Sequence, residues 1–261
     1  MIDIHTHFLP GLDDGAPERD ASIEIARQAA SDGVRVLVAT PHIREDYDVR
    51  PEELAERTAE IDATLREQGL PVNVLPGGEV AMTRVEALDD DQMRMVSLAG
   101  RTRYVLLETP YGRVPSGFEK TAFALQLRGF TPVIAHPERN ESFRARPERL
   151  AALVEGGALV QLTASAITGG EGRDTARFAL TLLEDGQAHV IASDVHRATG
   201  RRSSLADARE VLERRGLGEL AAWMTSEVPA RLIADKAPPA RPAGRPKRGL
   251  RGRLRRLGGR A

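Results

Sequence analysis

Short apolar runs alternate with longer amphipathic segments along most of the chain. Several runs are continuously apolar, as in Val36-Leu37-Val38-Ala39, which is typical of parallel strands covered on both faces. Seven strands are predicted in this way, at residues 2–5, 34–40, 72–76, 104–108, 132–136, 159–163 and 189–193. Because segments of helical spacing lie between them, the pattern predicts repeated strand–helix–strand units and a parallel sheet.

The segments between the strands have recognisable helix ends. Ile23, Ala26 and Ala30 form one apolar stripe that stops at Gly33. A helix over 147–156 is predicted to begin with a first-turn proline and to end at a glycine. Further helices are predicted at about 52–68, 116–128, 173–185, 204–214 and 217–233. These elements predict one α/β domain over residues 1–235, with a parallel sheet that is either open or closed.

The amino-acid composition limits the class of protein and the kinds of catalytic site that this chain can form. The 261 residues are 41% hydrophobic and 29% charged, which is the balance of a soluble globular protein, and this length suits a single α/β barrel. Cysteine is absent, which excludes disulfides, thiolate zinc sites and cysteine nucleophiles. No apolar stretch approaches the roughly 20 residues of a membrane-spanning helix, and the N-terminus lacks a basic-then-apolar leader. We therefore expect a cytoplasmic protein.

The formal net charge of −1 hides an asymmetry along the chain. Residues 236–261 contain ten Lys or Arg and no acidic residue, which leaves residues 1–235 with 27 basic and 38 acidic side chains, a net charge of −11. Nucleic-acid backbones are held by Lys and Arg that displace counterions. The acidic body therefore argues against nucleic-acid binding.

The basic segment 236–261 is predicted to be a tail outside the domain. Four prolines break any helix in its first half, and Arg, Gly and Leu dominate the remainder. One interpretation is a solvated, disordered tail, since its glycines oppose helix formation. The other is a short amphipathic helix with Leu250, Leu254 and Leu257 on one face, which would make weak contact with an anionic membrane. The sequence leaves both interpretations open.

Five of the six histidines stand at or just after the end of a predicted strand. His5 and His7 occupy alternate positions as the first strand ends, so both imidazoles point to the same side. His42, His136 and His196 follow three other strands. The sixth histidine begins its strand, and we assign it no role.

Acidic residues repeat this arrangement. Glu79 follows the third strand, Glu108 ends the fourth and Asp194 follows the last. Asp14 lies in the loop after the first strand, although Asp-Asp-Gly is also an ordinary turn sequence. Six of the seven strand ends thus carry a candidate metal ligand. A single His-x-His would mean little, but the ends of parallel strands in a barrel converge on one face, where these side chains would share a cavity.

The candidate ligands are imidazoles and carboxylates, which favour manganese, iron or zinc when no thiolate is present. Nine candidates exceed what one such ion uses, so more than one divalent cation is predicted. Two cations about 3.5–4 Å apart can activate a water molecule and hold both oxygens of a phosphoryl displacement. Phosphoester hydrolysis is therefore the favoured reaction.

Two arginines are candidates for binding the substrate phosphate. Arg139 follows His136-Pro137-Glu138, and Arg201 lies five residues after His196. A guanidinium group binds phosphate through two parallel hydrogen bonds and stabilises charge on the transferred group. Beside a metal centre, we expect both arginines to act in this way.

Six motifs that carry these residues occur in a specific order. They are Asp3-Ile4-His5-Thr6-His7, Asp13-Asp14-Gly15, Ala39-Thr40-Pro41-His42, Pro76-Gly77-Gly78-Glu79, the run from Val133 to Asn140, and Ala192-Ser193-Asp194-Val195-His196. Together they resemble the polymerase and histidinol phosphatase (PHP) superfamily. The run 136–140 and the opening residues 1–5 are similar to the bacterial manganese-dependent tyrosine-protein phosphatases of capsular and exopolysaccharide biosynthesis. The resemblance covers about residues 1–235.

This resemblance implies a distorted, TIM-like (β/α)7 barrel with a trinuclear metal centre, in which Mn²⁺ is expected and iron or zinc are alternatives. It implies that a metal-activated hydroxide hydrolyses phosphotyrosine on the tail of a bacterial tyrosine kinase that controls polysaccharide synthesis. By position, the implied metal ligands are His5, His7, Asp14, His42, Glu79, Glu108, His136, Asp194 and His196. The implied phosphate-binding residues are Arg139 and Arg201. Homologous folds also associate into oligomers, although the sequence favours no particular interface.

Three other functions would use the same metal motifs. A small-molecule phosphatase of the histidinol-phosphate type needs only a different pocket, and a non-catalytic metal-bound module could regulate a kinase by binding alone. A nuclease or proofreading module would need a basic groove, which the acidic body does not offer. Segment 43–47 is also more acidic than the resemblance leads us to expect, which leaves a shifted substrate preference open.

Overall fold

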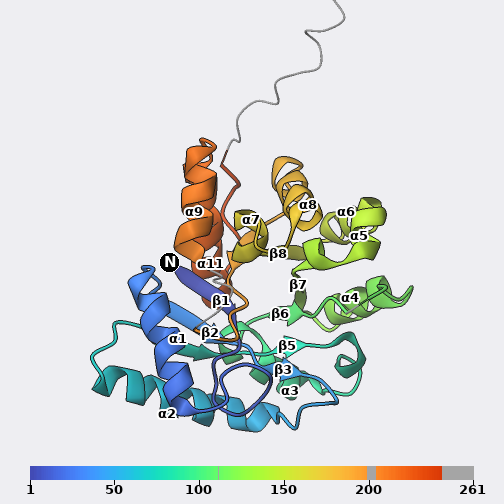
Figure 1. Cartoon of the computed structure of the whole chain (residues 1–261). Helices are drawn as coiled ribbons and strands as arrows, with labels where there is room; N and C mark the ends of the chain where they lie inside the picture. The colour runs from blue at the N-terminus through green and yellow to red at the C-terminus, as the bar shows by residue number, and fades with distance from the viewer. Residues whose placement is uncertain (111, 199–203, 243–261) are drawn as a thin grey trace, which may run out of the picture.

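All paired strands run parallel, and helices surround them on the outside (Figure 1). The computed structural model describes residues 1–110, 112–198 and 204–242 of the chain. The described strands are β1 (Ile2–Thr6), β2 (Val36–Ala39), β3 (His42–Ile43), β4 (Asn73–Pro76), β5 (Glu79–Val80), β6 (Tyr104–Leu107), β7 (Thr131–Ala135), β8 (Leu159–Thr163) and β9 (Val190–Ala192). Each of the seven predicted strand regions overlaps one of these strands, and β3 and β5 are two short additions.

The strands form two sheets. One has the order β1-β2-β4 and the other the order β3-β5-β6-β7-β8-β9, so the described strands do not close into one continuous sheet. The chain passes from the first sheet to the second twice, between β2 and β3 and between β4 and β5. Pro41, which has no N–H to donate, stands at the first of these breaks. The predicted α/β fold with parallel strands is therefore present, with its sheet in two parts.

The two sheets also approach each other beyond β9. Thr6 and Val195 form an isolated parallel bridge. His7 N donates to Val195 O at 2.9 Å, and Asp194 N donates to His5 O at 2.9 Å. These bonds hold the carboxyl end of β1 beside the segment that follows β9, which brings the first and last strands of the fold together.

The predicted helices are present, with ends shifted by a few residues. The described α helices are α1 (Arg19–Ser31), α2 (Leu54–Glu67), α3 (Asp90–Val96), α4 (Phe118–Leu127), α5 (Glu141–Ala145), α6 (Pro147–Glu155), α7 (Ala164–Thr168), α8 (Arg173–Glu184), α9 (Leu205–Arg214), α10 (Gly218–Ala222) and α11 (Val228–Ile233). The helix predicted over 217–233 is divided by a π-helical turn at Trp223–Glu227. Pro229 explains the division, because it offers no N–H to the carbonyl four residues earlier.

Three short helices were not predicted. Each begins at a side-chain cap: Asp89 caps α3 in a capping box with Gln92, Asn140 caps α5 and Thr163 caps α7. At five to seven residues, these helices are too short to show a clear apolar period. Of the three, α7 follows its strand, β8, directly, so the cap at Thr163 also ends that strand.

The core lies between the strands and the surrounding helices. Residues such as Leu106, Val133 and Ile134 are fully buried, as the continuous apolar runs predict. Phe118 of α4 and Phe143 of α5 are also fully buried, and their rings meet edge to face with centroids 5.9 Å apart. This contact joins the helices that cover β6 and β7.

Residues 236–242 pack along the body as an extended strap. Tyr104 Oη donates to Lys236 O at 3.0 Å, and Trp223 Nε1 donates to Pro239 O at 3.2 Å. Arg241 donates to Leu183 O and Ala188 O at 2.7 and 2.6 Å. Because Tyr104 begins β6 and Ala188 precedes β9, the strap crosses the amino ends of the strands. Residues 243–261, which include most of the basic tail, lie outside the described part of the chain.

The histidine that was given no role in the sequence and the membrane-spanning potential of the helices can both be judged from the structure. His189 accepts a hydrogen bond from Val160 N at 3.2 Å, and burial lowers its pKa to about 4, in keeping with a neutral structural histidine. Among the described residues, no helix has the length and apolar character that crossing a membrane requires.

Two phenylalanines of α4 provide a matched test of the core. Phe118 is fully buried, whereas Phe123 is 59% exposed. We expect Phe118→Ala to lower the free energy of unfolding by about 3–5 kcal/mol, because it leaves a cavity against Phe143. Phe123→Ala should change it by less than about 0.5 kcal/mol. Urea denaturation of both variants measures the difference, and equal losses would contradict the assigned packing.

Candidate metal centre

The candidate ligands gather at the carboxyl ends of the strands. His5 lies in β1, His42 and Glu79 begin the short strands β3 and β5, and the other candidates follow strands or lie in the loop after β1. Four groups of these side chains bring their ligand atoms within 4.8 Å of one another. Within the described residues, the groups contain His5, His7, Asp14, His42, Glu79, Glu108, His136, Asp194 and His196, the nine positions named from the sequence.

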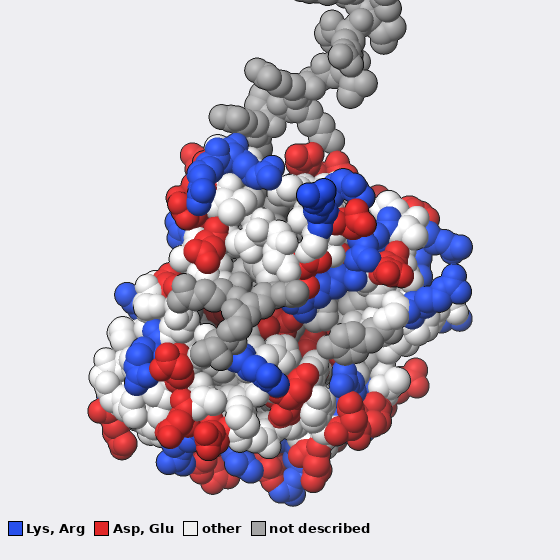
Figure 2. Space-filling model, viewed as in Figure 1, with Lys and Arg blue, Asp and Glu red and all other residues white. Residues whose placement is uncertain are grey.

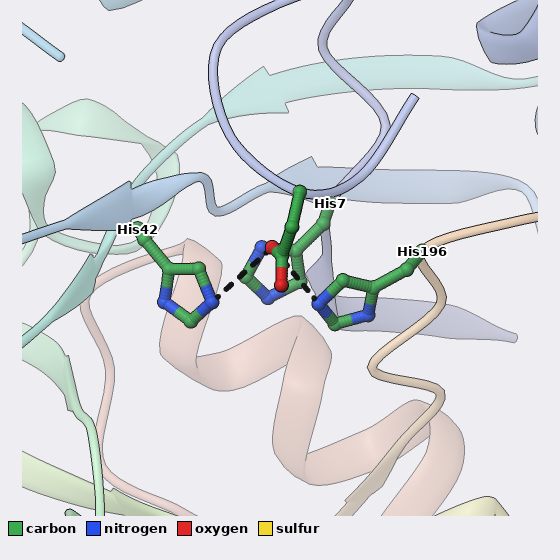
Figure 3. A group of neighbouring side chains, drawn as sticks. His7, His42 and His196 are labelled. Carbon is green, nitrogen blue, oxygen red and sulfur yellow. Dashed lines mark ion pairs between the residues drawn. The ribbon is translucent and has the colours of Figure 1, made fainter. Parts of the chain in front are cut away.

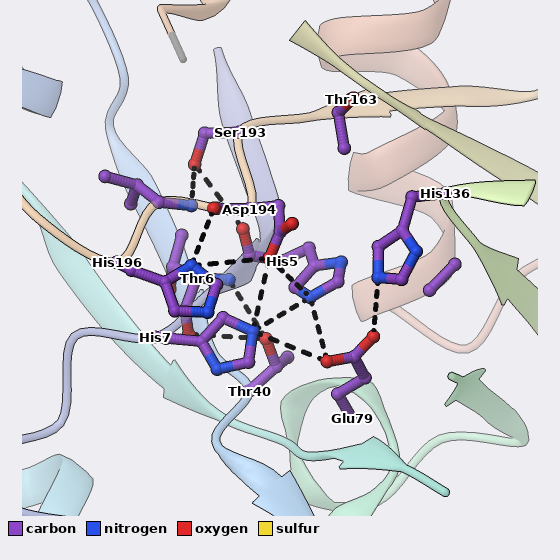
Figure 4. A network of polar contacts seen from close by, with 12 residues as sticks. His5, Thr6, His7, Thr40, Glu79, His136, Thr163, Ser193, Asp194 and His196 are labelled. Atoms are coloured by element: carbon purple, nitrogen blue, oxygen red, sulfur yellow. Dashed lines mark hydrogen bonds and ion pairs between the residues drawn. The ribbon is translucent and has the colours of Figure 1, made fainter. Parts of the chain in front are cut away.

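The central group consists of His5, His7 and Asp194, and Glu79 lies against it (Figure 4). The Nε2 atoms of His5 and His7 lie 3.1 Å apart. Asp194 Oδ1 lies 3.2 and 3.3 Å from these two nitrogens, and Glu79 Oε2 lies 3.4 and 3.5 Å from them. Two imidazole nitrogens and two carboxylate oxygens thus converge on one point, as ligands do around a shared cation.

Glu79 connects the central group to the imidazoles of His136 and His42. Its Oε1 lies 2.9 Å from His136 Nε2, and its Oε2 lies 3.0 Å from His42 Nδ1. Glu108 Oε1 lies 3.8 Å from the same His42 nitrogen. Because Glu79 contacts imidazoles both in the central group and outside it, its carboxylate would help to hold cations in either place.

The outer group contains His7, His42, His196 and Asp14 (Figure 3). Asp14 Oδ1 lies 3.5 Å from His42 Nε2 and 3.4 Å from His196 Nε2. The rings of His7 and His196 stack, with centroids 4.1 Å apart. Asp14 is 47% exposed in its side chain, whereas His7 is buried, so this group faces the solvent.

Other polar groups hold the imidazoles in place. Asp13 Oδ2 lies 2.7 Å from His7 Nδ1, and Gln161 Oε1 lies 2.9 Å from His5 Nδ1. The backbone oxygen of Asp194 lies 3.0 Å from His196 Nδ1. When these acceptors bind the Nδ1–H groups, Nε2 of each ring is left as the ligand atom. The sequence motifs predict no such role for Asp13 or Gln161, although Gln161 is a lone amide in the mostly apolar strand β8, which is a signal of one.

The backbone at the site is held in rare conformations. His136 has a φ of 36° and Asp194 a φ of 53°, both in the left-handed region that non-glycine residues seldom adopt. A Cβ on Gly15 would lie only 1.8 Å from His7 O, so the loop carrying Asp13 and Asp14 approaches β1 more closely than any other residue allows. Such local strain is common where a site fixes its side chains.

The charges at the site depend on one another. Burial opposes ionisation of Glu79 and Asp194, but the charge of His5 and hydrogen bonds from the other imidazoles hold the pKa of both carboxyls well below the ordinary range. Burial likewise opposes protonation of His7, yet hydrogen bonds to Asp13, Asp194 and Glu79 raise its pKa well above the usual value. Burial and then the neighbouring Glu79 raise the pKa of Glu108. The acidic cluster therefore attracts positive charge.

Several buried atoms at the site lack a well-directed hydrogen bond within the described part of the chain. Both ring nitrogens of His42 and Oε2 of Glu79 are buried without a well-directed hydrogen bond. Imidazole and carboxylate are suitable donors for manganese, iron or zinc. This donor set fits divalent cations, and Glu79 belongs to two of the groups that would hold them.

Arg139 lies beside the centre. Its guanidinium donates to Asp194 Oδ2 and, at 3.0 Å, to Glu171 Oε1. Ser165 Oγ donates to the same Glu171 oxygen at 2.7 Å, which fixes the carboxylate. The neighbouring Glu138 is fully buried and accepts from Thr163 N at 2.7 Å. Glu171 is thus a further residue at the site that sequence analysis did not assign, and Arg201 lies outside the described residues.

Arg44 contributes a positively charged side chain next to Glu108. Its Nη1 donates to Glu108 Oε1 at 3.0 Å, and its other nitrogens donate to Asp46 at 2.6 and 2.7 Å. Acidic and basic side chains are interspersed over the face of the molecule seen in Figure 2.

Comparison with known proteins identifies relatives of this chain. The family model described as "Capsular polysaccharide synthesis, CpsB/CapC" matches residues 1–234. Tyrosine-protein phosphatase YwqE of Bacillus subtilis (strain 168) is 38% identical over 226 residues, which cover 86% of this chain and 89% of that protein. The putative tyrosine-protein phosphatase CapC of Staphylococcus aureus is 33% identical over 204 residues, covering 77% of this chain and 79% of that protein.

A solved structure also matches. It comes from work on YwqE from Bacillus subtilis and CpsB from Streptococcus pneumoniae, described there as unique metal-dependent tyrosine phosphatases. The TM-score is 0.84 at 37% sequence identity, and the match covers 92% of this chain and 99% of that chain. The fold is thus shared over nearly all of this chain.

The close approach at Gly15 can be tested by adding a methyl group. We expect Gly15→Ala to push the Asp13–Asp14 loop away from His7 and to weaken Mn²⁺ binding about 10- to 100-fold, because the orienting carboxylate moves. Gly117→Ala is the matched control, since a Cβ there would meet nothing nearer than 4.0 Å. Titration calorimetry with Mn²⁺ measures both affinities, and an unchanged affinity in Gly15→Ala would contradict the assigned role of the loop.

The raised pKa of His7 predicts that metal binding releases protons. Without a cation, His7 holds a proton near neutral pH, and a ligand imidazole must be neutral. Mn²⁺ affinity should therefore fall as the pH falls. Calorimetric titrations at one pH, in two buffers of different ionisation enthalpy, measure the protons released, and His7→Ala should release fewer. Identical heats in the two buffers would show that this interpretation is wrong.

Proposed function

Because this chain belongs to the CpsB/CapC family of capsular polysaccharide synthesis, we propose that it is a metal-dependent tyrosine-protein phosphatase. The observation that carries the proposal is the convergence of nine imidazoles and carboxylates beside a partly buried arginine, Arg139. Such a site suits phosphoric monoester hydrolysis. The relatives named as tyrosine-protein phosphatases identify phosphotyrosine as the substrate group.

The proposed ligands are the nine residues of the four groups, and Mn²⁺ is the proposed ion, with iron or zinc as alternatives. When bound, the cations lower the pKa of water and offset the negative charge of the phosphoryl group. Glu79 and Asp194 remain ionised and hold the imidazoles in the orientation that ligation requires. Asp13 and Gln161 keep Nδ1 of His7 and His5 occupied, so neither ring can turn away.

Arg139 is the proposed phosphate-binding residue of the described part of the chain, and Arg201 is proposed to assist it. Glu171 and Asp194 fix the guanidinium of Arg139 at the edge of the metal centre, where its remaining N–H groups can bind the equatorial oxygens of the phosphoryl group. The leaving phenolate of tyrosine has a pKa of about 10, so its departure demands little help from a general acid.

The biological setting follows from the family. We propose that the protein acts in the cytoplasm on the phosphorylated tail of a tyrosine kinase that controls capsule or exopolysaccharide synthesis. The proposed catalytic domain is residues 1–235, a distorted (β/α)7 barrel. The basic tail beyond the strap is proposed to remain disordered or to make weak contact with an anionic membrane, with the eight Lys and Arg of residues 243–261 as the supporting observation.

Phosphate release by metal-stripped protein resupplied with Mn²⁺ tests the function. We expect preferential release from a phosphotyrosine peptide over a phosphoserine peptide and over histidinol phosphate. His136→Ala should abolish metal-dependent activity, and Arg139→Lys should lower kcat/KM about 100-fold, because lysine cannot replace the two parallel hydrogen bonds.

Metal content, measured on each variant, separates lost ligation from lost phosphate binding. Preference for histidinol phosphate would instead indicate a small-molecule phosphatase. Bound metal without hydrolysis of any of the three substrates would indicate a non-catalytic module.

A further inference from the structure

A polar groove lies next to the metal centre. Segment 43–52 lines one side of it, and Arg84, Leu88 and Gln92 line the other. Its volume is about 540 Å³, which is larger than the phosphate group alone requires. The metal centre uses none of these residues as a ligand, and the mechanism above leaves the groove without a role.

Two residues of the groove wall contact residues of the candidate metal centre. Arg44, on the groove wall, donates to Glu108 at 3.0 Å. The ring of Tyr47, also on the wall, lies parallel to that of His42, with centroids 5.5 Å apart and 7° between the planes. A phosphotyrosine held at the centre would therefore have its neighbouring residues at the mouth of this groove.

The walls are held together by bonds between side chains. Thr83 Oγ1 donates to Glu45 Oε2 at 3.0 Å, and Gln92 Nε2 donates to Glu52 Oε1 at 2.8 Å. Both bonds connect segment 43–52 to the opposite wall. Asp46 is bound by Arg44 through both carboxylate oxygens. The groove is thus formed before any ligand enters, which lowers the entropic cost of binding an extended chain.

Arg84 is the group in the groove that best indicates a ligand. It ends the short 3-10 helix Met82–Arg84, five residues after Glu79. Its Nε is buried and has no hydrogen-bond partner, and its guanidinium forms no ion pair with a described residue. By contrast, Arg44 and Arg50 on the other wall pair with Asp46 and Glu53. A partly buried arginine without a counter-ion is suited to an acidic side chain from outside.

We propose that this groove binds the polypeptide segment beside the phosphotyrosine of the protein substrate, and that Arg84 pairs with an acidic residue of that segment. The inference rests on the proposed phosphatase function and adds to it a source of specificity for protein substrates. A small aryl phosphate reaches the metal centre without entering the groove. Residues of the groove should therefore affect peptides and leave small substrates unaffected.

The full chain loaded with Mn²⁺ provides the test. Three substrates are compared: p-nitrophenyl phosphate, a phosphotyrosine peptide with flanking glutamates, and the same peptide with flanking lysines. We expect Arg84→Ala to lower kcat/KM for the glutamate peptide about fivefold, mainly through KM, because one ion pair is lost. Arg84→Glu should reverse the preference in favour of the lysine peptide. Neither change should alter kcat/KM for p-nitrophenyl phosphate.

Arg57→Ala is the matched control, because Arg57 is an exposed arginine of α2 outside the groove. It should leave all three substrates unchanged, which separates a local ion pair from a general loss of positive charge. Equal effects of the Arg84 variants on peptides and p-nitrophenyl phosphate, or no effect on any substrate, would overturn the groove proposal while unaltered protein still hydrolyses phosphotyrosine. Failure of the unaltered protein on all three substrates would overturn the proposed function, and the groove proposal with it.

Discussion

The buried carboxylate of Glu79 contacts four imidazoles, those of His5, His7, His42 and His136. A carboxylate that is fully removed from water is costly unless positive charge surrounds it. In the polypeptide alone, protonated imidazoles supply part of that charge, and divalent cations would supply more. The buried charge of Glu79 is therefore unfavourable on its own and becomes favourable when cations bind. The strand ends must place the surrounding imidazoles accurately enough to contact this one carboxylate.

The division of the sheet provides this placement. Glu79 opens β5, which pairs with β3 on one side and β6 on the other, so that Glu79 stands in register with His42 and Leu106. If β2 and β4 simply continued, these residues would stay in the first sheet. The two breaks move them into the second sheet, beside the residues that follow β6 and β7. The same two breaks therefore divide the sheet and bring the candidate ligands together.

The main strands and the nine candidate ligand positions could be predicted from the sequence because two patterns coincide. Continuous apolar runs marked the strands, and polar residues at their ends marked the face where parallel strands converge, which is how His136 and Asp194 were found 58 residues apart. The break between β2 and β3 was not predicted, because a two-residue strand has no pattern of its own. Gln161 and Glu171 were missed for another reason: they contact a ligand or an arginine, and only three-dimensional proximity reveals that role. The caps at Asp89, Asn140 and Thr163 were present in the sequence but were not used.

The strap formed by residues 236–242 has a consequence for how the molecule can be attached to anything else. Arg241 is bound to the carbonyls of Leu183 and Ala188, at the amino ends of the strands. The chain therefore leaves the body on the side opposite the candidate metal centre. Any anchor that acts through the C-terminal residues, whether a surface or a fused protein, would hold the molecule on the side away from the candidate metal centre and leave that centre accessible.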